Sequence, residues 1–174
     1  MAAILFILNA LLTLVVVAFL LRALMPLVRA DFRNPLGQAV LQFTDPLVRP
    51  LRRILGPVRR VDVASIVAVL LVQFAGTALL QLVGGAGFPV AATLVASLRM
   101  LAQTVLSLFS IALLAYVVLS WIAPGAYSPA TRLLGALCEP LLRPFRRIIP
   151  PIAGLDLAPV FALICLQALQ LVLR

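Results

Sequence analysis

The chain has 174 residues, of which 64% are hydrophobic and 11% are charged, and its mean hydropathy is +1.21. Soluble domains contain about 45–50% apolar residues, so this composition excludes a soluble globule, and two cysteines are too few for a disulfide scaffold. All 14 basic residues are arginine, five residues are acidic and histidine is absent. The net charge is therefore +9, and the chain lacks the commonest general base and metal ligand.

Four long stretches of the chain carry no charge, and they predict its membrane spans. A spanning helix needs about 20 predominantly apolar residues. The second uncharged stretch is interrupted between Gly84 and Pro89, where glycines and a proline favour a turn. We therefore predict an all-α membrane protein with four transmembrane helices, at about residues 2–22, 62–83, 100–122 and 156–173.

Arg99 precedes the third predicted span. One helix from Val90 to Trp121 would be about 48 Å long at 1.5 Å per residue, whereas the hydrocarbon core is about 30 Å thick. We therefore expect residues 84–98 to form an extracytoplasmic connector, with Val90 to Leu98 as an apolar approach in the interface and Arg99 snorkelling there. The alternative is that Arg99 lies inside the membrane and lines a pathway.

The distribution of arginines predicts the orientation of the spans. Arginines gather after the first and third spans, whereas the turn after the second span has no charge. Because cytoplasmic loops carry the excess of basic residues, both arginine-rich segments should be cytoplasmic and both termini extracytoplasmic. No basic residue precedes the first apolar stretch, so we expect that stretch to be a retained helix and not a cleavable signal peptide.

The two charged segments are related by a shift of 94 residues. Between Thr44 and Val63, 9 of 20 positions are identical to those 94 residues later, against roughly 2 expected from the biased composition. This similarity predicts two tandem copies, residues 1–83 and 99–174. Each copy contains two spans, so both copies should have the same orientation and be related by an axis along the membrane normal.

Each copy has a short amphipathic segment between its spans, at residues 35–57 and 132–150. At 100° per residue, its apolar side chains fall within an arc of about 120° and its arginines lie opposite. This pattern predicts a helix in the cytoplasmic interface, with its arginines toward anionic phospholipid headgroups or a partner. The candidate contact residues are Arg49, Arg52, Arg53, Arg143, Arg146 and Arg147.

Acidic residues and prolines predict where these helices begin and bend. In each copy an acidic residue directly precedes a proline, which is typical of a helix N-cap followed by its first residue. A proline one turn later predicts a kink, and an earlier Asn-Pro pair predicts a first helical piece that ends by Phe43. The residues of this motif are Asn34, Pro35, Asp45, Pro46, Pro50, Glu139, Pro140 and Pro144.

Asp62 and Asp156 directly precede the second span of each copy. An acidic residue there can cap free N–H groups and complement the helix dipole. The alternative is that the carboxylate pairs with an arginine of the preceding interfacial helix and locks that helix to the span. The arginines available are Arg52 and Arg53 for Asp62, and Arg146 and Arg147 for Asp156.

Together, these motifs resemble the bacterial YggT family. The resemblance covers nearly the whole chain and rests on Thr44-Asp45-Pro46, Pro50-Leu51-Arg52-Arg53-Ile54 and Asp62-Val63-Ala64-Ser65, and on Glu139-Pro140-Leu141-Leu142-Arg143-Pro144-Phe145-Arg146-Arg147-Ile148 with Asp156 in the second copy. It implies a small multi-pass protein of the bacterial cytoplasmic (inner) membrane. It also implies the processes with which the family is associated: osmotic stress and potassium uptake, division or envelope organisation, and haem attachment in plastids.

No group of residues in the sequence predicts catalysis. Cys138 and Cys165 are 27 residues apart, and no glycine-rich phosphate loop follows a strand. We therefore expect no enzyme activity, no cofactor, no metal site and no nucleic-acid partner. Gln73 and Gln167 lie inside predicted spans, where they either form interhelical hydrogen bonds or line an ion pathway.

The sequence is compatible with three functions from different classes. The first, which we favour, is a structural, assembly or stress-homeostasis factor whose arginine-rich helices contact anionic lipid in the bilayer, a membrane-protein partner or another copy of the chain. The second is a small transporter or transport auxiliary that affects ion and osmotic balance. The third is a lipid-modifying enzyme, which the missing nucleophile and base argue against.

Overall fold

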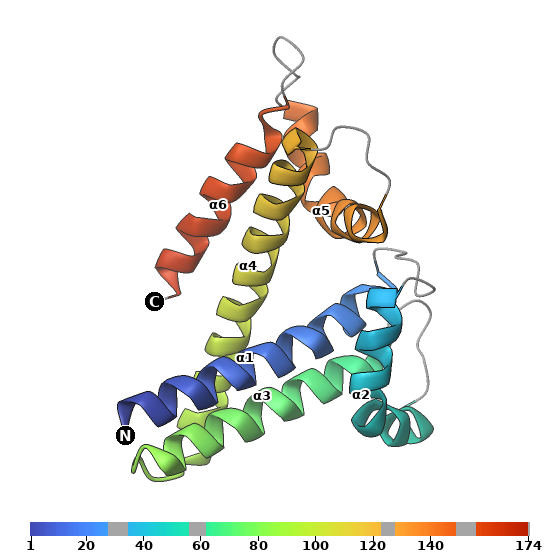
Figure 1. The fold of residues 1–174 in the computed structure, drawn as a ribbon. Coiled ribbons are helices and arrows are strands. Elements are labelled where there is room, and N and C mark those ends of the chain that lie inside the picture. The colour runs from blue at the N-terminus through green and yellow to red at the C-terminus, as the bar shows by residue number, and fades with distance from the viewer. Residues whose placement is uncertain (28–34, 56–61, 123–127, 149–155, 174) are drawn as a thin grey trace. The chain divides into compact units, whose positions relative to one another are not determined.

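The computed structural model describes residues 1–27, 35–55, 62–122, 128–148 and 156–173, and all the regular structure in these ranges is helical (Figure 1). The all-α class is therefore confirmed for the described residues. Helices α1, α3 and α4 are long and apolar enough to cross a membrane, whereas α6 is apolar but has only 15 residues, so a count of four spans stays a prediction. The helices are α1 (Ala2–Leu24), α2 (Pro35–Ile54), α3 (Val63–Val83), α4 (Val90–Ile122), α5 (Pro129–Ile148) and α6 (Ala158–Val172).

These helices form two compact units. Unit 1 consists of Met1–Ala23 and Ala39–Val105, and unit 2 consists of Leu24–Gln38 and Leu106–Arg174. The first half of α4 therefore belongs to unit 1 and its second half to unit 2.

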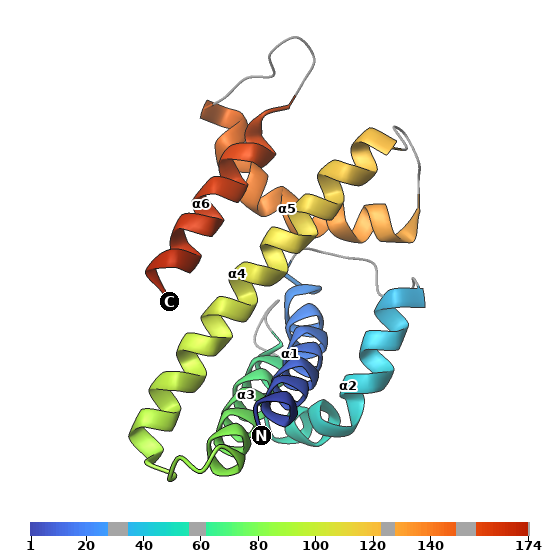
Figure 2. The same cartoon turned by 60° about the vertical axis from the view of Figure 1, so that its left-hand side comes forward.

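In unit 1, α1 and α3 lie side by side and run in opposite directions (Figures 1 and 2). Gly76 of α3 makes this approach close, because a Cβ atom there would come within 2.1 to 2.9 Å of the Leu12 side chain of α1. The buried apolar side chains of these two helices are Val16, Phe19, Leu20, Ala23, Ala64, Ala68 and Val69.

The turn predicted after the second span is present. Helix α3 ends at Val83, and the N–H of Gly84 donates to the carbonyl of Leu80 over 2.9 Å. Gly85 has a φ of +76°, a conformation that favours glycine because it has no Cβ. The chain then enters α4 at Val90, where Thr93 donates to the side chain of Gln81 over 2.6 Å.

In unit 2, α6 packs beside α5 and the second half of α4. Gln170 of α6 donates to the hydroxyl of Ser110 of α4 over 3.3 Å. Pro159 lies in the first turn of α6, where its missing N–H leaves no bond unmade. The buried side chains on these three helices are Ala112, Leu113, Leu137, Cys138, Leu142, Ala158, Pro159, Ala162 and Leu166.

Helix α4 is longer than the sequence analysis expected. It runs without interruption from Val90 to Ile122, so residues 90–98 of the expected connector are helical and continuous with the predicted span. The physical reason is local, since no glycine or proline lies between Val90 and Ile122 to end the helix. The expected boundary was set by bilayer thickness, which a single helix does not need to obey.

The helix starts expected at Pro46 and Pro140 are wrong. Asp45 and Glu139 lie inside α2 and α5, which begin at Pro35 and Pro129. Each helix continues past its internal prolines, and Figures 1 and 2 draw it as two stretches with different directions. Proline removes one intrahelical hydrogen bond and bends a helix, but flanking turns with good partners can hold the helix together. Asn34 lies outside the described residues.

We predict that Gly76 is needed for the packing of α1 on α3. Gly76→Ile should lower the free energy of unfolding in detergent micelles by about 1–3 kcal/mol, because overpacking forces neighbouring side chains and backbone to move. Gly76→Ala should cost less, since the Leu12 side chain can rotate away. Gly87→Ala is the matched control, because nothing lies within 4 Å of a Cβ atom there. Equal stability of Gly76→Ile and wild type would contradict this prediction.

Candidate functional site

A buried arginine joins α1 to α2 in unit 1. Arg22, at the end of α1, is only 2% exposed. Its Nη1 atom donates to the Thr44 hydroxyl over 2.7 Å and to the Leu41 carbonyl over 3.2 Å, and it lies 2.8 Å from the Asp45 carboxylate. Asp45 also pairs with Arg49 over 2.7 Å. A buried charge is stable only with such partners, so this cluster fixes the middle of α2 against the end of α1.

The charge of Asp45 is stabilised within this cluster. Burial acts to raise the pKa of Asp45, but the hydrogen bond and charge of Arg22, with a smaller contribution from Arg49, outweigh burial. The pKa of Asp45 is therefore below its ordinary value, and the carboxylate stays ionised at neutral pH.

A second ion pair joins the end of α2 to the start of α3. Arg52 donates to the Asp62 carboxylate, which also accepts a hydrogen bond from the Ser65 hydroxyl over 2.7 Å. Burial raises the pKa of Asp62, but the hydrogen bonds from Ser65 and Arg52 outweigh it, so this pKa is also lowered. The Asp62 side chain makes no hydrogen bond to the backbone of the first turn, so here the ion pair is present and a side-chain N-cap is not.

In unit 2 a single arginine serves two acids. Arg146 lies 2.8 Å from both Glu139 and Asp156, and it also donates to the Tyr116 hydroxyl. Burial acts to lower the pKa of Arg146, but these partners outweigh burial and raise it. Asp156 additionally accepts a hydrogen bond from the backbone N–H of Ala158 over 3.0 Å. At this position both interpretations of the acidic residue apply, because it caps the helix start and pairs with arginine.

The two clusters use positions that are 94 residues apart. Arg52 and Asp62 correspond to Arg146 and Asp156, and in each unit they connect the arginine-rich helix to the following apolar helix. The acidic residue on the arginine-rich helix pairs with a different arginine in each unit. Asp45 pairs with the buried Arg22, whereas Glu139 pairs with Arg146 itself, because position 116 is tyrosine and not arginine.

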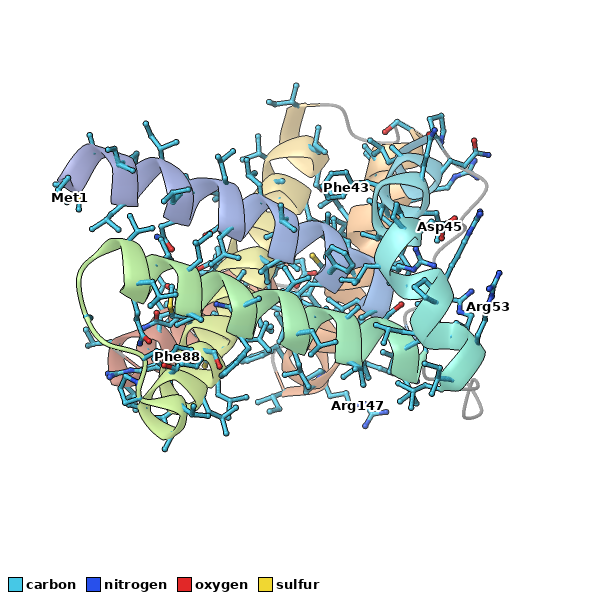
Figure 3. The ribbon with its side chains drawn as sticks, turned by 90° about the horizontal axis from the view of Figure 1, so that it is seen from below. Met1, Phe43, Asp45, Arg53, Phe88 and Arg147 are labelled. Atoms are coloured by element: carbon cyan, nitrogen blue, oxygen red, sulfur yellow. The ribbon has the colours of Figure 1, made fainter. Side chains whose placement is uncertain are left out.

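The six candidate arginines therefore have different surroundings. Arg52 and Arg146 are held by carboxylates of the following helix, and Arg49 is paired within α2 but is 77% exposed. Arg53, Arg143 and Arg147 are exposed. Figure 3 shows Arg53 and Arg147 extending away from their helices. The motif prolines Pro46, Pro50, Pro140 and Pro144 are exposed on α2 and α5, as is Pro35 at the start of α2.

The intramembrane polar candidates also differ from one another. Gln73 is buried and donates to the Thr77 hydroxyl over 3.1 Å within α3. Gln167 is exposed on α6, and Arg99 is exposed on the first half of α4. Sequence reasoning treated the two glutamines as equivalent, and the structure shows that they are not.

Arg22 is the residue of this site that sequence reasoning missed as a site residue. The available signal was a lone arginine at the end of a 20-residue apolar run, which needs a partner if that run is a span. Among the described residues, no group of three His, Cys, Asp or Glu side chains could hold a metal ion. Burial raises the pKa of the Cys138 thiol to about 11, which makes it a poor nucleophile.

We predict that Arg22 stabilises unit 1 through its buried contacts. Arg22→Leu should lower the free energy of unfolding in micelles by about 3 kcal/mol, because breaking a buried ion pair leaves groups without partners. Arg53→Leu removes the same charge from an exposed position and is the matched control. The double variant Arg22→Leu/Asp45→Leu should recover part of the loss. If Arg22→Leu and Arg53→Leu have the same small effect, the structural role of Arg22 is wrong.

Comparison with known proteins identifies the family. The CCB3/YggT family model matches two segments of the chain, residues 1–83 and 95–174. An uncharacterized protein of Pseudomonas aeruginosa is 41% identical over 171 residues, which are 97% of this chain and 87% of that protein. The uncharacterized protein YggT of Escherichia coli K12 is 31% identical over 170 residues, 95% of this chain and 86% of that protein.

A plant relative matches a shorter part of the chain. The chloroplastic YlmG homolog protein 2 of Arabidopsis thaliana is 40% identical over 63 residues, 36% of this chain and 25% of that protein. No solved structure matches the chain. The two family-model segments cover most of the sequence, and the resemblance drawn from the arginine and proline motifs is confirmed. The chain therefore belongs to the CCB3/YggT family.

Proposed function

We propose that this chain is a non-enzymatic, multi-pass protein of the bacterial inner membrane, with a structural, assembly or stress-homeostasis role exerted through anionic lipid. One observation carries the proposal: in each unit, the arginine-rich helix is tied to the next apolar helix by an arginine and an aspartate at equivalent positions, Arg52–Asp62 and Arg146–Asp156. This ion pair holds the arginine-rich helix at the end of a span, where lipid headgroups lie.

The exposed apolar side chains of α2 support an interfacial location. Phe43, Leu47 and Ile54 are exposed, and at 100° per residue they fall within about 40° of one another. By the same count Arg49 and Arg52 lie opposite these side chains, and Arg53 lies about 100° from their centre. A helix with exposed apolar side chains on one side and arginines on the other is stable at the boundary between acyl chains and headgroups.

The arginines not held by the following helix are the ones available to lipid. Arg53, Arg143 and Arg147 are exposed, and an arginine can hold a phosphate with two parallel hydrogen bonds. Near an anionic membrane surface each such charge contributes about 1 kcal/mol. The paired Arg52 and Arg146 then act as positioning residues, because their carboxylate partners compete with phosphate.

We propose four spans, with α6 as the fourth, and two tandem copies of the same orientation. At 1.5 Å per residue α6 is about 23 Å long, which is shorter than the hydrocarbon core. A short span is tolerated through local thinning of the bilayer, snorkelling or association. The arginine-rich α2 and α5 would face the cytoplasm, and both termini would lie outside it.

We predict that anionic-lipid preference depends on the exposed arginines. The triple variant Arg53→Gln/Arg143→Gln/Arg147→Gln should lose preference for phosphatidylglycerol over phosphatidylcholine, by up to about fivefold for each charge removed. The preference can be measured with spin-labelled lipids in proteoliposomes. The matched control replaces the same arginines with lysine, which keeps the charge but not the planar fork.

The outcomes of this experiment separate the functions considered. Unchanged preference in the glutamine variant would contradict the lipid role. Loss in the lysine variant as well would show that guanidinium geometry matters, and retention would show that charge suffices. Potassium flux through proteoliposomes of the purified wild-type chain would favour the transport alternative instead.

We predict that the turn between α3 and α4 is extracytoplasmic. A cysteine introduced at Gly87, an exposed residue of that turn, should react with a membrane-impermeant maleimide in intact spheroplasts, in a Cys165→Ala background. Arg53→Cys is the control for the cytoplasmic side, and its cysteine should react with the maleimide only after the membrane is permeabilised. The reverse pattern of labelling would contradict the proposed orientation.

A further inference from the structure

We propose that α6 is a self-association helix, whose outer face packs against the same face of α6 in a second copy of the chain. The face consists of Val160, Ile164, Gln167 and Leu171, named here the α6 seam. No arginine of the lipid proposal takes part in it, but it rests on the proposed placement of α6 as the fourth span.

The α6 seam has the spacing of a helix-pairing surface. Its residues are separated by four, three and four positions, the repeat that keeps one stripe of a helix facing a partner. At 100° per residue the seam spans about 60°, and it lies opposite the buried residues Ala158, Ala162 and Leu166 that face into unit 2. Val160, Ile164 and Leu171 are 48%, 59% and 70% exposed. One face of α6 therefore packs within unit 2, and the opposite face, which carries the seam, is exposed.

Part of the seam borders an open hollow. Ile164, Gln167 and Leu171 line it together with Ala168 and Gln170, and its volume is about 590 Å³. Ala168 has a small side chain, and small residues allow helix backbones to approach closely in membranes.

Exposure of the Gln167 side chain to lipid acyl chains is energetically unfavourable. Gln167 lies near the middle of α6, at the depth of the hydrocarbon if α6 spans the bilayer. Within the part of the chain that the structure describes, no hydrogen bond to its side chain is found, whereas Gln170 donates to Ser110. An amide without a hydrogen-bond partner in an apolar medium costs several kcal/mol. A partner that donates and accepts at this depth removes that cost.

The electrostatic complementarity of the seam identifies a second copy as the partner. Two copies inserted with the same orientation are related by a two-fold axis along the membrane normal, so equal residues meet at equal depth. Gln167 then faces Gln167. Because a primary amide has both a donor and an acceptor, each N–H dipole meets the carbonyl of the other copy. A lipid acyl chain has neither group.

The equivalent face of α3 shows that a helix can occupy this position. The residues 94 positions before the α6 seam are Ile66, Leu70, Gln73 and Thr77. There, Thr77 donates to the sulfur of Met100 over 3.8 Å, so α4 lies against this face, and both Gln73 and Thr77 are buried. In unit 1 a helix of the same unit lies against the Gln73–Thr77 end of this face, whereas Ile66 and Leu70 are 38% and 41% exposed. We infer that α6 uses a helix of a second copy.

Disulfide cross-linking of the full chain tests the geometry of the seam. Single cysteines are placed in a Cys165→Ala background at Ile164, Gln167 or Leu171, and at the flanking exposed positions Phe161 and Val172 as matched controls. Cys138 is retained, because it is buried and its raised pKa of about 11 keeps it protonated and slow to oxidise. The variants are reconstituted in phosphatidylethanolamine–phosphatidylglycerol vesicles at high dilution and oxidised with copper phenanthroline.

The proposal expects a periodic pattern of covalent dimers on non-reducing gels. The seam cysteines should form at least fivefold more dimer than Phe161→Cys and Val172→Cys. Equal dimer at seam and flank positions, or no dimer at any position, would overturn the proposal.

The role of the amide is tested without cysteines. Resonance energy transfer between labelled copies, measured as the lipid-to-protein ratio rises, gives the dissociation constant of the dimer. Gln167→Leu should weaken the dimer by about three- to thirtyfold, the range measured for hydrogen bonds between membrane helices. Gln167→Asn should restore most of the affinity, and Gln73→Leu should not change it. An unchanged dissociation constant in Gln167→Leu would overturn the pairing of amides.

Discussion

The ion pair between an arginine-rich helix and the start of the next apolar helix is the interaction on which each unit depends. An apolar helix that enters a membrane leaves free N–H groups and a partial positive charge at its first turn. The negative charge of an aspartate there complements this dipole and attracts an arginine. Asp156 also accepts a hydrogen bond from the N–H of Ala158, whereas Asp62 binds Arg52 and the Ser65 hydroxyl without a side-chain cap. Through Arg52–Asp62 and Arg146–Asp156, each apolar helix is also joined to the arginine-rich helix that precedes it. Because the arginine-rich helices are held in place, Arg53, Arg143 and Arg147 keep their exposed positions.

The two units meet this constraint with different residues. In unit 1, Arg22 neutralises Asp45, which leaves Arg52 for Asp62. In unit 2, the position of Arg22 is Tyr116, and Arg146 must serve both acids. The contact between neighbouring apolar helices differs in the same way. Gly76 allows close packing of α3 on α1, whereas the residue 94 positions later is Gln170, which holds α6 to α4 by a hydrogen bond.

The sequence predicted those features that arise from local pattern. Apolar length predicted α1 and α3 to within two residues, and the glycine pair predicted the turn at Gly84. The start of α4 was missed, because thickness of the bilayer was applied where no residue breaks the helix. The Asn-Pro pair predicted the start of α2 at Pro35, but the further helix starts expected at Pro46 and Pro140 were wrong. Asp-Pro and Glu-Pro resemble a cap even where flanking turns continue the helix. Arg22 and Gly76 matter only through residues distant in sequence, which periodicity does not reveal.

The different surroundings of Gln73 and Gln167 bear on the choice between a structural and a transport role. An ion site built on the repeat needs both amides in equivalent surroundings, with their carbonyl oxygens available. Gln73 is buried and its amide N–H₂ group is engaged with Thr77, whereas Gln167 is exposed on the outer face of α6. The two glutamines therefore occupy corresponding positions 94 residues apart, but their surroundings differ. An ion site formed by both amides would need the Gln73 side chain to leave its contact with Thr77, so the different surroundings of the two glutamines argue against such a site.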